Sequence, residues 1–137
     1  MTEQDAQNEL CYYTLAHGDP AFIHQHVVDA FMAQHADDQT KPIGITFALV
    51  GLYLHVEKHL TGREVQRAHM VLGRKKQTWP SFELPANRGA MRVTDVIAAP
   101  PGSERDRAID AWCVSVWDAF RDQQSTVIDL LRQYGYS

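Results

Sequence analysis

Apolar residues recur every three or four positions along most of the chain, which is the period of an amphipathic helix. The clearest case is the stretch 103–134, where one stripe collects Ile109, Trp112, Cys113, Val116, Phe120, Val127, Leu131 and Tyr134. Gln123 and Gln124 interrupt this stripe, and an unbroken helix of that length would measure about 45 Å, so we predict a bend there. No segment alternates apolar and polar residues for long enough to predict a strand.

Turn and capping residues divide the chain into separate helices. Pro20 and Pro42 suit the first position of a helix, and Thr61 with Glu64 has the spacing of a capping box. The helices predicted from these boundaries cover residues 3–16, 20–35, 42–60, 61–72 and 103–134, with a short one beginning at Thr94.

Residues 74–93 have no hydrophobic period and contain two prolines and a glycine. We predict a long irregular loop here, with Trp79 and Phe82 packed onto the helices. A chain of 137 residues is long enough to bury one core without disulfides or a metal. The predicted fold is therefore all-α: a single helical domain over residues 1–137, built as a bundle of about five helices with a long irregular loop at 74–93.

Composition narrows the classes of partner. The net charge is −4, and although residues 63–92 hold seven Lys or Arg against two Glu, Trp79 is the one tryptophan among them. Nucleic-acid binding would favour aromatic residues alternating with the basic ones, so we predict no nucleic-acid partner. Cys11 and Cys113 stand alone, which predicts neither a disulfide framework nor a zinc knuckle.

The cellular location is predicted from whether any segment has the sequence of a signal peptide or the length of a membrane span. The first ten residues are polar and acidic, unlike a signal peptide. The longest apolar run, residues 43–54, is about twelve residues, whereas a membrane span needs about 20. We therefore expect a cytoplasmic protein without membrane contact.

The histidines are the candidate residues for a functional site. On the predicted helix 20–35, His24 and His35 fall on the face that also carries Val27 and Phe31, whereas His26 falls on the opposite side. We therefore predict that His24 and His35 are buried and that His26 is exposed.

A second pair, His55 and His59, stands four positions apart at the end of a line of small residues, Gly44, Ala48 and Gly51. Histidines one helical turn apart can share a metal ion, although Val56 stands where a metalloprotease HExxH motif needs glutamate. The predicted metal ligands are His55 and His59 with His24 or His35 from the neighbouring helix. Neutral imidazoles favour zinc, iron or nickel, and an open coordination position would permit a metal-bound water to act as nucleophile.

The alternative hypothesis is a non-catalytic protein-interaction or assembly module. Its histidines would be hydrogen-bonded within the core, and the 74–93 loop would meet the partner. Catalytic residues, substrate and oligomeric state are not identified by these patterns, and the partner could be a small molecule, a protein or a second copy of the chain.

Three motifs carry a resemblance to known proteins. They are H-x4-DAF-x2-QH (His24, Asp29, Ala30, Phe31, Gln34, His35), TDV (Thr94, Asp95, Val96) and W-x2-SVW (Trp112, Ser115, Val116, Trp117). Over about residues 10–130 the chain resembles a small, mostly bacterial family known only as a domain of unknown function. The resemblance implies a helical fold and no known activity. Such relatives often carry more cysteines near the N-terminus and a histidine in the last helix, where this chain has Cys11 and roughly Gln123 and Gln124.

Overall fold

The computed structural model describes residues 1–16 and 20–136. Their regular secondary structure is entirely helical, as predicted. It consists of α1 (Glu3–Ala16), α2 (His24–His35), α3 (Pro42–Val56), α4 (Gly62–Gly73), α5 (Val93–Ala98), α6 (Ser103–Ala119), a 3₁₀ turn η1 (Arg121–Gln123) and α7 (Gln124–Arg132). The number of helices is slightly larger than the predicted five because the last predicted helix is divided, and α5 is the short helix that was predicted to begin at Thr94.

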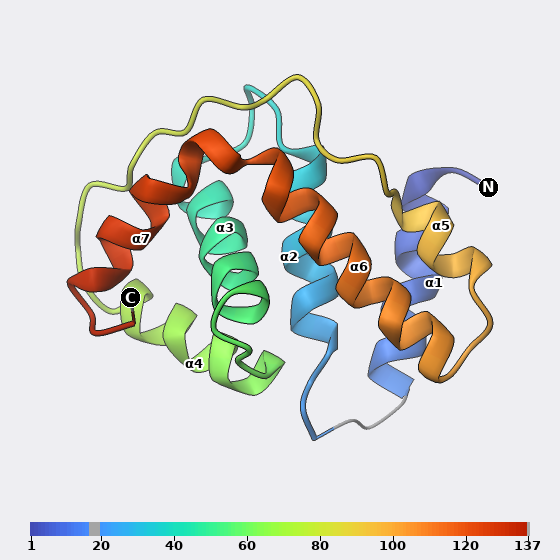
Figure 1. The fold of residues 1–137 in the computed structure, drawn as a ribbon. Coiled ribbons are helices and arrows are strands. Elements are labelled where there is room, and N and C mark those ends of the chain that lie inside the picture. The colour runs from blue at the N-terminus through green and yellow to red at the C-terminus, as the bar shows by residue number, and fades with distance from the viewer. Residues whose placement is uncertain (17–19, 137) are drawn as a thin grey trace.

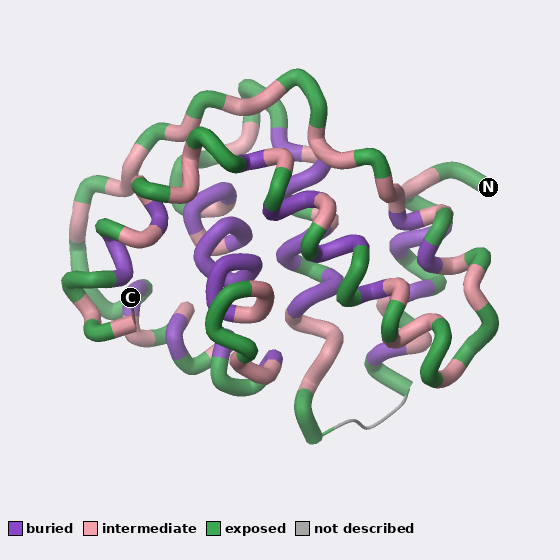
Figure 2. The backbone as a smooth tube through the Cα atoms, in the orientation of Figure 1, coloured by how far each residue is buried: buried purple, intermediate pink, exposed green. Residues whose placement is uncertain are grey.

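Two helices form the centre of the molecule. Figure 1 shows α2 and α3 lying side by side, with α6 passing in front of α2, and α6 packs against both helices. Helices α1 and α5 pack at one end of this arrangement, and α4 and α7 pack against α3 at the other. Buried positions concentrate on the central helices (Figure 2), and the largest fully buried side chains are those of Trp112, Trp117 and Phe120. None of the helices in residues 1–16 and 20–136 is both long and apolar enough to cross a membrane.

The C-terminal segment confirms both the predicted stripe and the predicted bend. Every residue of the stripe is buried except Tyr134, which is half-buried. The bend falls at η1, where Gln124 donates from Nε2 to the carbonyl oxygen of Trp117 at 3.2 Å. That hydrogen bond satisfies one of the carbonyl groups left open at the end of α6.

The predicted boundary at Thr61 is confirmed, whereas α2 begins at His24 and not at the predicted Pro20. Thr61 and Glu64 form the predicted capping box, with the Glu64 N–H donating to Oγ1 of Thr61 at 3.2 Å. Helix α3, however, ends at Val56, so the prediction of a helix reaching residue 60 was wrong. The chain turns instead through His59, whose φ is +58°.

The buried face of α2 differs from the predicted one. Its buried residues are His26, Val27, Asp29, Ala30, Ala33 and Gln34, whereas Val28 and Met32 remain 38% and 42% exposed. Alanines on the inner face allow α2 to lie close to α3 and α6, and Gln34 between them accepts a hydrogen bond from Nε1 of Trp112 on α6. The prediction that His26 is exposed was therefore wrong, and His24 and His35 are half-buried rather than buried.

Residues 74–92 form the predicted irregular loop, which runs across the top of the molecule in Figure 1. Trp79 packs edge-on against Phe47, as expected of an anchoring residue. Further along, Arg88 donates from Nη1 to the carbonyl oxygens of Ala33 and Ala36 at 3.2 and 2.7 Å. The loop thereby supplies hydrogen bonds to the C-terminal end of α2, where carbonyl groups have no partner within the helix.

Candidate functional site

Two of the predicted metal ligands, His24 and His35, lie on the side of α2 that faces α1. Nδ1 of His24 is 2.9 Å from Oγ1 of Thr14, and burial lowers the pKa of His24. His35 stacks on Phe31, and its Nε2 lies 3.4 Å from the Glu3 carboxylate. Both rings therefore contribute to the contact between α1 and α2, away from α3.

The histidine of α2 that does meet α3 is His26. Its ring stacks on that of His55, with centroids 3.5 Å apart and planes inclined by 15°. His26 is only 4% exposed. Because positions 24 and 26 are separated by about 200° around a helix, a contact between His26 and α3 directs His24 away from it.

His55 is held at both ring nitrogens. Nδ1 lies 3.3 Å from the carbonyl oxygen of Leu60, and Nε2 lies 2.9 Å from Oδ1 of Asp110 on α6. Asp110 is itself exposed, whereas His55 is half-buried. The imidazole is thus fixed between the turn that follows α3 and a carboxylate from another helix.

His59 is positioned by the same turn. Its backbone N–H donates to the carbonyl oxygen of His55 at 3.1 Å, and the N–H of Leu60 donates to that of Leu54 at 3.0 Å. The positive φ of His59 closes the helix end in the left-handed conformation that glycine most often provides. The His59 side chain is exposed and stands outside α3, so its relation to His55 is no longer that of two residues on one helical face.

These residues surround a pocket of about 280 Å³. Its lining consists of Ala21, Ile23, His26, His55, His59, Leu60, Thr61 and Asp110. Phe22 beside it also has a positive φ, of 59°, and its carbonyl oxygen lies so close to Gly62 that any larger residue there would collide with the backbone. Two non-glycine residues in the left-handed region therefore flank the pocket, a conformation that clusters at functional sites.

A buried carboxyl group lies one helical turn beyond His26. Asp29 is 3% exposed; its Oδ1 accepts from Nε2 of Gln25 at 3.2 Å, and its Oδ2 has no hydrogen-bond partner among the residues that the structure describes. The carboxyl group fits because Gly51 opposite has no side chain. Burial raises the pKa of Asp29 well above its usual value, which favours the neutral acid.

Cys113 on α6 lies next to His26 and Asp29. The thiol is fully buried, and its Sγ lies 3.8 Å from the carbonyl oxygen of His26. Burial, and after it the charges of Asp110 and Asp29, raise the pKa of Cys113 well above its usual value. The thiol is thus held in its protonated form, which is a poor nucleophile and a poor metal ligand.

The structure brings together a different set of residues from the predicted one. Of the four predicted ligands, His55 and His59 line one pocket, whereas His24 and His35 lie against α1. Within the described part of the chain, no three His, Cys, Asp or Glu side chains are arranged to hold a metal ion as they stand. His26 and Asp110 were missed because both lie where periodicity predicts solvent, and their shared partner His55 is 29 and 55 residues away.

Comparison with known proteins gives the family. A model of a family of unknown function, DUF5946, matches residues 4–121. The chain belongs to this family. No curated protein and no solved structure matches it. The matched region contains the whole pocket, and the helical fold expected of the family from its motifs is the one observed.

Proposed function

We propose that the pocket binds a transition-metal ion, held by His55, Asp110 and a further imidazole from His26 or His59. The main support is the way in which His55 faces two acceptors. A carbonyl oxygen can only accept, so in the tautomer with its proton on Nδ1 the ring donates to Leu60, 3.3 Å away. Nε2 of a neutral ring would then direct its lone pair at the Asp110 carboxylate, 2.9 Å away. Such a pair requires a cation between its atoms, either a metal ion or a proton.

The chemistry of the donor set indicates which ions would suit. A metal-bound histidine usually donates its other N–H to a backbone carbonyl or a carboxylate, and Nδ1 of His55 lies 3.3 Å from such a carbonyl, that of Leu60. Imidazole nitrogens with one carboxylate oxygen suit zinc, iron or nickel. Calcium and magnesium would need more oxygen ligands than Asp110 alone offers.

Coordination requires one side chain to turn. Nitrogen lone pairs lie in the plane of the imidazole ring, so the stacked rings of His26 and His55 do not aim at a common point. Either His26 rotates out of the stack, or the exposed His59 swings inward over the pocket. Of the ligands predicted from the sequence, the proposed site thus keeps His55 and one alternative, His59, and it replaces His24 and His35 by Asp110 or by Asp110 and His26.

Metal content and affinity test this proposal. Protein purified without added metal should contain or take up about one equivalent of zinc, iron or nickel by elemental analysis and titration calorimetry. His55→Ala and Asp110→Asn should each weaken binding by at least about tenfold, whereas the control His35→Gln should bind as the parent does. Absence of binding in the parent, or equal loss in the control, would overturn the proposal.

The same contact favours a second candidate, in which the cation is a proton. His55 would then be an imidazolium ion paired with Asp110 and stacked on His26, and the pocket would be an acid–base site for a small polar ligand. Nitrogen-15 spectra of the metal-free protein at pH 7 should show protons on both ring nitrogens of His55. A neutral His55 ring in metal-free protein would exclude this candidate.

The interaction module predicted as the alternative stays a prediction. Exposed apolar side chains on the outer face of α2, Val28 and Met32, support it. Sedimentation equilibrium of the parent and of Met32→Glu tests it, because a self-association through this face should weaken in the variant.

A further inference from the structure

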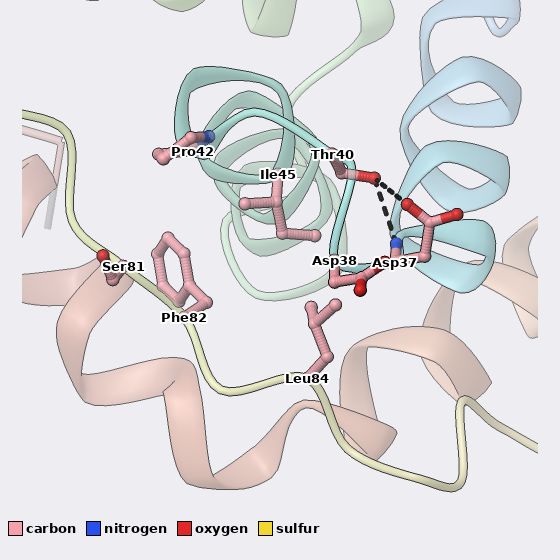
Figure 3. A pocket seen from close by; sticks show the side chains of 8 residues that line it. All are labelled: Asp37, Asp38, Thr40, Pro42, Ile45, Ser81, Phe82 and Leu84. Carbon is pink, nitrogen blue, oxygen red and sulfur yellow. Dashed lines mark hydrogen bonds between the residues drawn. The ribbon is translucent and has the colours of Figure 1, made fainter.

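A second cavity, of about 360 Å³, lies at the other end of α2, between the turn that leads into α3 and the 74–92 loop. Figure 3 shows that Ile45 of α3 and Phe82 and Leu84 of the loop surround the space. Ile45 is 5% exposed, and both loop residues are half-buried. The size and the apolar lining are those of a pocket for a small organic molecule.

The polar part of this cavity is negatively charged. Asp37 and Asp38 both line it, and its lining contains no lysine or arginine. Oδ1 of Asp37 accepts from the backbone N–H of Gln39 at 2.9 Å and from Oγ1 of Thr40 at 3.4 Å, which fixes the turn. The carboxylate of Asp38 is exposed and accepts no hydrogen bond from the residues that the structure describes.

The basic residue of the loop that interacts with Asp37 is engaged elsewhere. Arg88 is close enough to Asp37 for their charges to interact, but its guanidinium donates to the carbonyl oxygens of Ala33, Gln34 and Ala36. Asp38 forms no ion pair with the residues that the structure describes.

We propose that this cavity binds a small organic cation, an ammonium group joined to an aromatic or branched aliphatic body. The apolar body would pack between Phe82, Leu84 and Ile45, and the ammonium group would face Asp38. A neutral ligand would lack the ionic contact, and an anionic one would be repelled by both carboxylates. This inference is independent of the metal proposal, because no residue lines both pockets.

Phenethylamine is a suitable probe, with 2-phenylethanol and 3-phenylpropionate as its neutral and anionic counterparts. Titration followed by amide chemical shifts should give saturable changes within residues 37–45 and 81–84. A ligand of this size should bind with a Kd of about 1–10 mM. The alcohol should bind at least about threefold more weakly, and the carboxylate should not bind measurably.

Single substitutions test the carboxylate and the apolar part of the cavity separately. Asp38→Asn should weaken phenethylamine by about threefold and leave the alcohol unchanged. Phe82→Ala should weaken the binding of the amine and of the alcohol by about tenfold. Phe82→Leu keeps an apolar side chain in place, so it distinguishes the loss of the aromatic contact from a displacement of the loop. Asp118→Asn on α6, another exposed carboxylate, should change nothing. Shifts that do not saturate, equal affinity for amine and alcohol, or no effect of Asp38→Asn would each overturn the proposal.

Discussion

Asp29 and Gln34 lie on the same buried face of α2, and both are polar, yet their surroundings differ completely. Gln34 donates from Nε2 to the carbonyl oxygens of Arg88 and Met91 at 3.3 and 2.8 Å, and its Oε1 accepts from Nε1 of Trp112 at 2.9 Å. Asp29 accepts one hydrogen bond, from Gln25. A buried polar group with every partner in place stabilises a fold, whereas one left partly unsatisfied costs free energy.

The difference separates the part of α2 that joins the loop and α6 from the part that lies beside the candidate site. Around Gln34, the helix, the 74–92 loop and α6 are joined by a satisfied network. Around Asp29, a neutral carboxyl group, a protonated thiol and two stacked imidazoles lie together beside a pocket. Proteins retain such costly arrangements most often at functional sites.

The largest expected effect comes from breaking the satisfied network. Gln34→Ala leaves Trp112 Nε1 and two backbone carbonyl groups without partners, so the free energy of unfolding should fall by about 3–4 kcal/mol in urea denaturation. The control Gln39→Ala, in the exposed turn after α2, should change it by less than about 0.5 kcal/mol. A loss below about 1 kcal/mol at Gln34 would mean that water replaces these bonds and that the two ends of α2 are alike.

The close approach of Asp29 to Gly51 gives the next effect. A Cβ at Gly51 would collide with the Asp29 carboxyl oxygens, so Gly51→Ala should destabilise by about 2–3 kcal/mol. Gly44→Ala on the same helix meets nothing closer than Thr40 Cγ2 at 3.7 Å and should stabilise by about 0.5–1 kcal/mol. Asp29→Ala combined with Gly51→Ala should recover part of the loss. Simple additivity in this cycle would show that the two residues do not touch.

The pH dependence of Asp29 sharpens the comparison further. A carboxyl group whose pKa is raised by folding stabilises the folded state least at high pH, because the unfolded chain then loses the proton more easily. The parent should therefore lose stability as pH rises above about 3.9, until the raised pKa of Asp29 is passed. Asp29→Asn has no titrating group at this position. The melting temperature of the variant minus that of the parent should therefore increase from pH 4 to pH 8. A constant difference across that range would show that Asp29 is ionised in the folded protein.

The smallest effect is expected at the pocket itself. His59→Gly keeps the positive φ without steric cost, so it should stabilise the metal-free protein by about 1 kcal/mol. His59→Ala should not stabilise it, because alanine has the same difficulty with this conformation as histidine. Equal melting temperatures for the two variants would indicate that the left-handed turn is not maintained in solution.

The sequence predicts most of the fold because most of the core consists of large apolar side chains at helical spacing. The stripe of α6 and α7 is correct for that reason, and the bend is correct because two glutamines interrupt it. The orientation of α2 is wrong because its inner face is built from alanines and polar residues, while Val28 and Met32 remain partly exposed. The period of the large apolar residues identifies the inner face of a helix only when those residues are also the buried ones.

The sequence identifies some residues of the candidate site and not others. His55 and His59 stand out by their spacing and by the small residues that precede them. Asp110 lies on the polar side of its helix, and nothing local distinguishes it from Asp118 or Asp122. Its role depends on a contact with His55, 55 residues away, and such pairings are set by how the helices pack.

The contact of Arg88 with the end of α2 has a consequence for the order of folding. Arg88 and its acceptors are separated by 52 to 55 residues, so the chain must close a long segment before this contact can form. Helices α2, α3 and α4 can associate through nearer neighbours first. The last carbonyl groups of α2 would then face water in the transition state, and Arg88→Ala should accelerate unfolding while leaving the refolding rate almost unchanged, as stopped-flow measurements can determine. That result would mean that the loop docks onto the end of α2 after the bundle has formed and then slows unfolding.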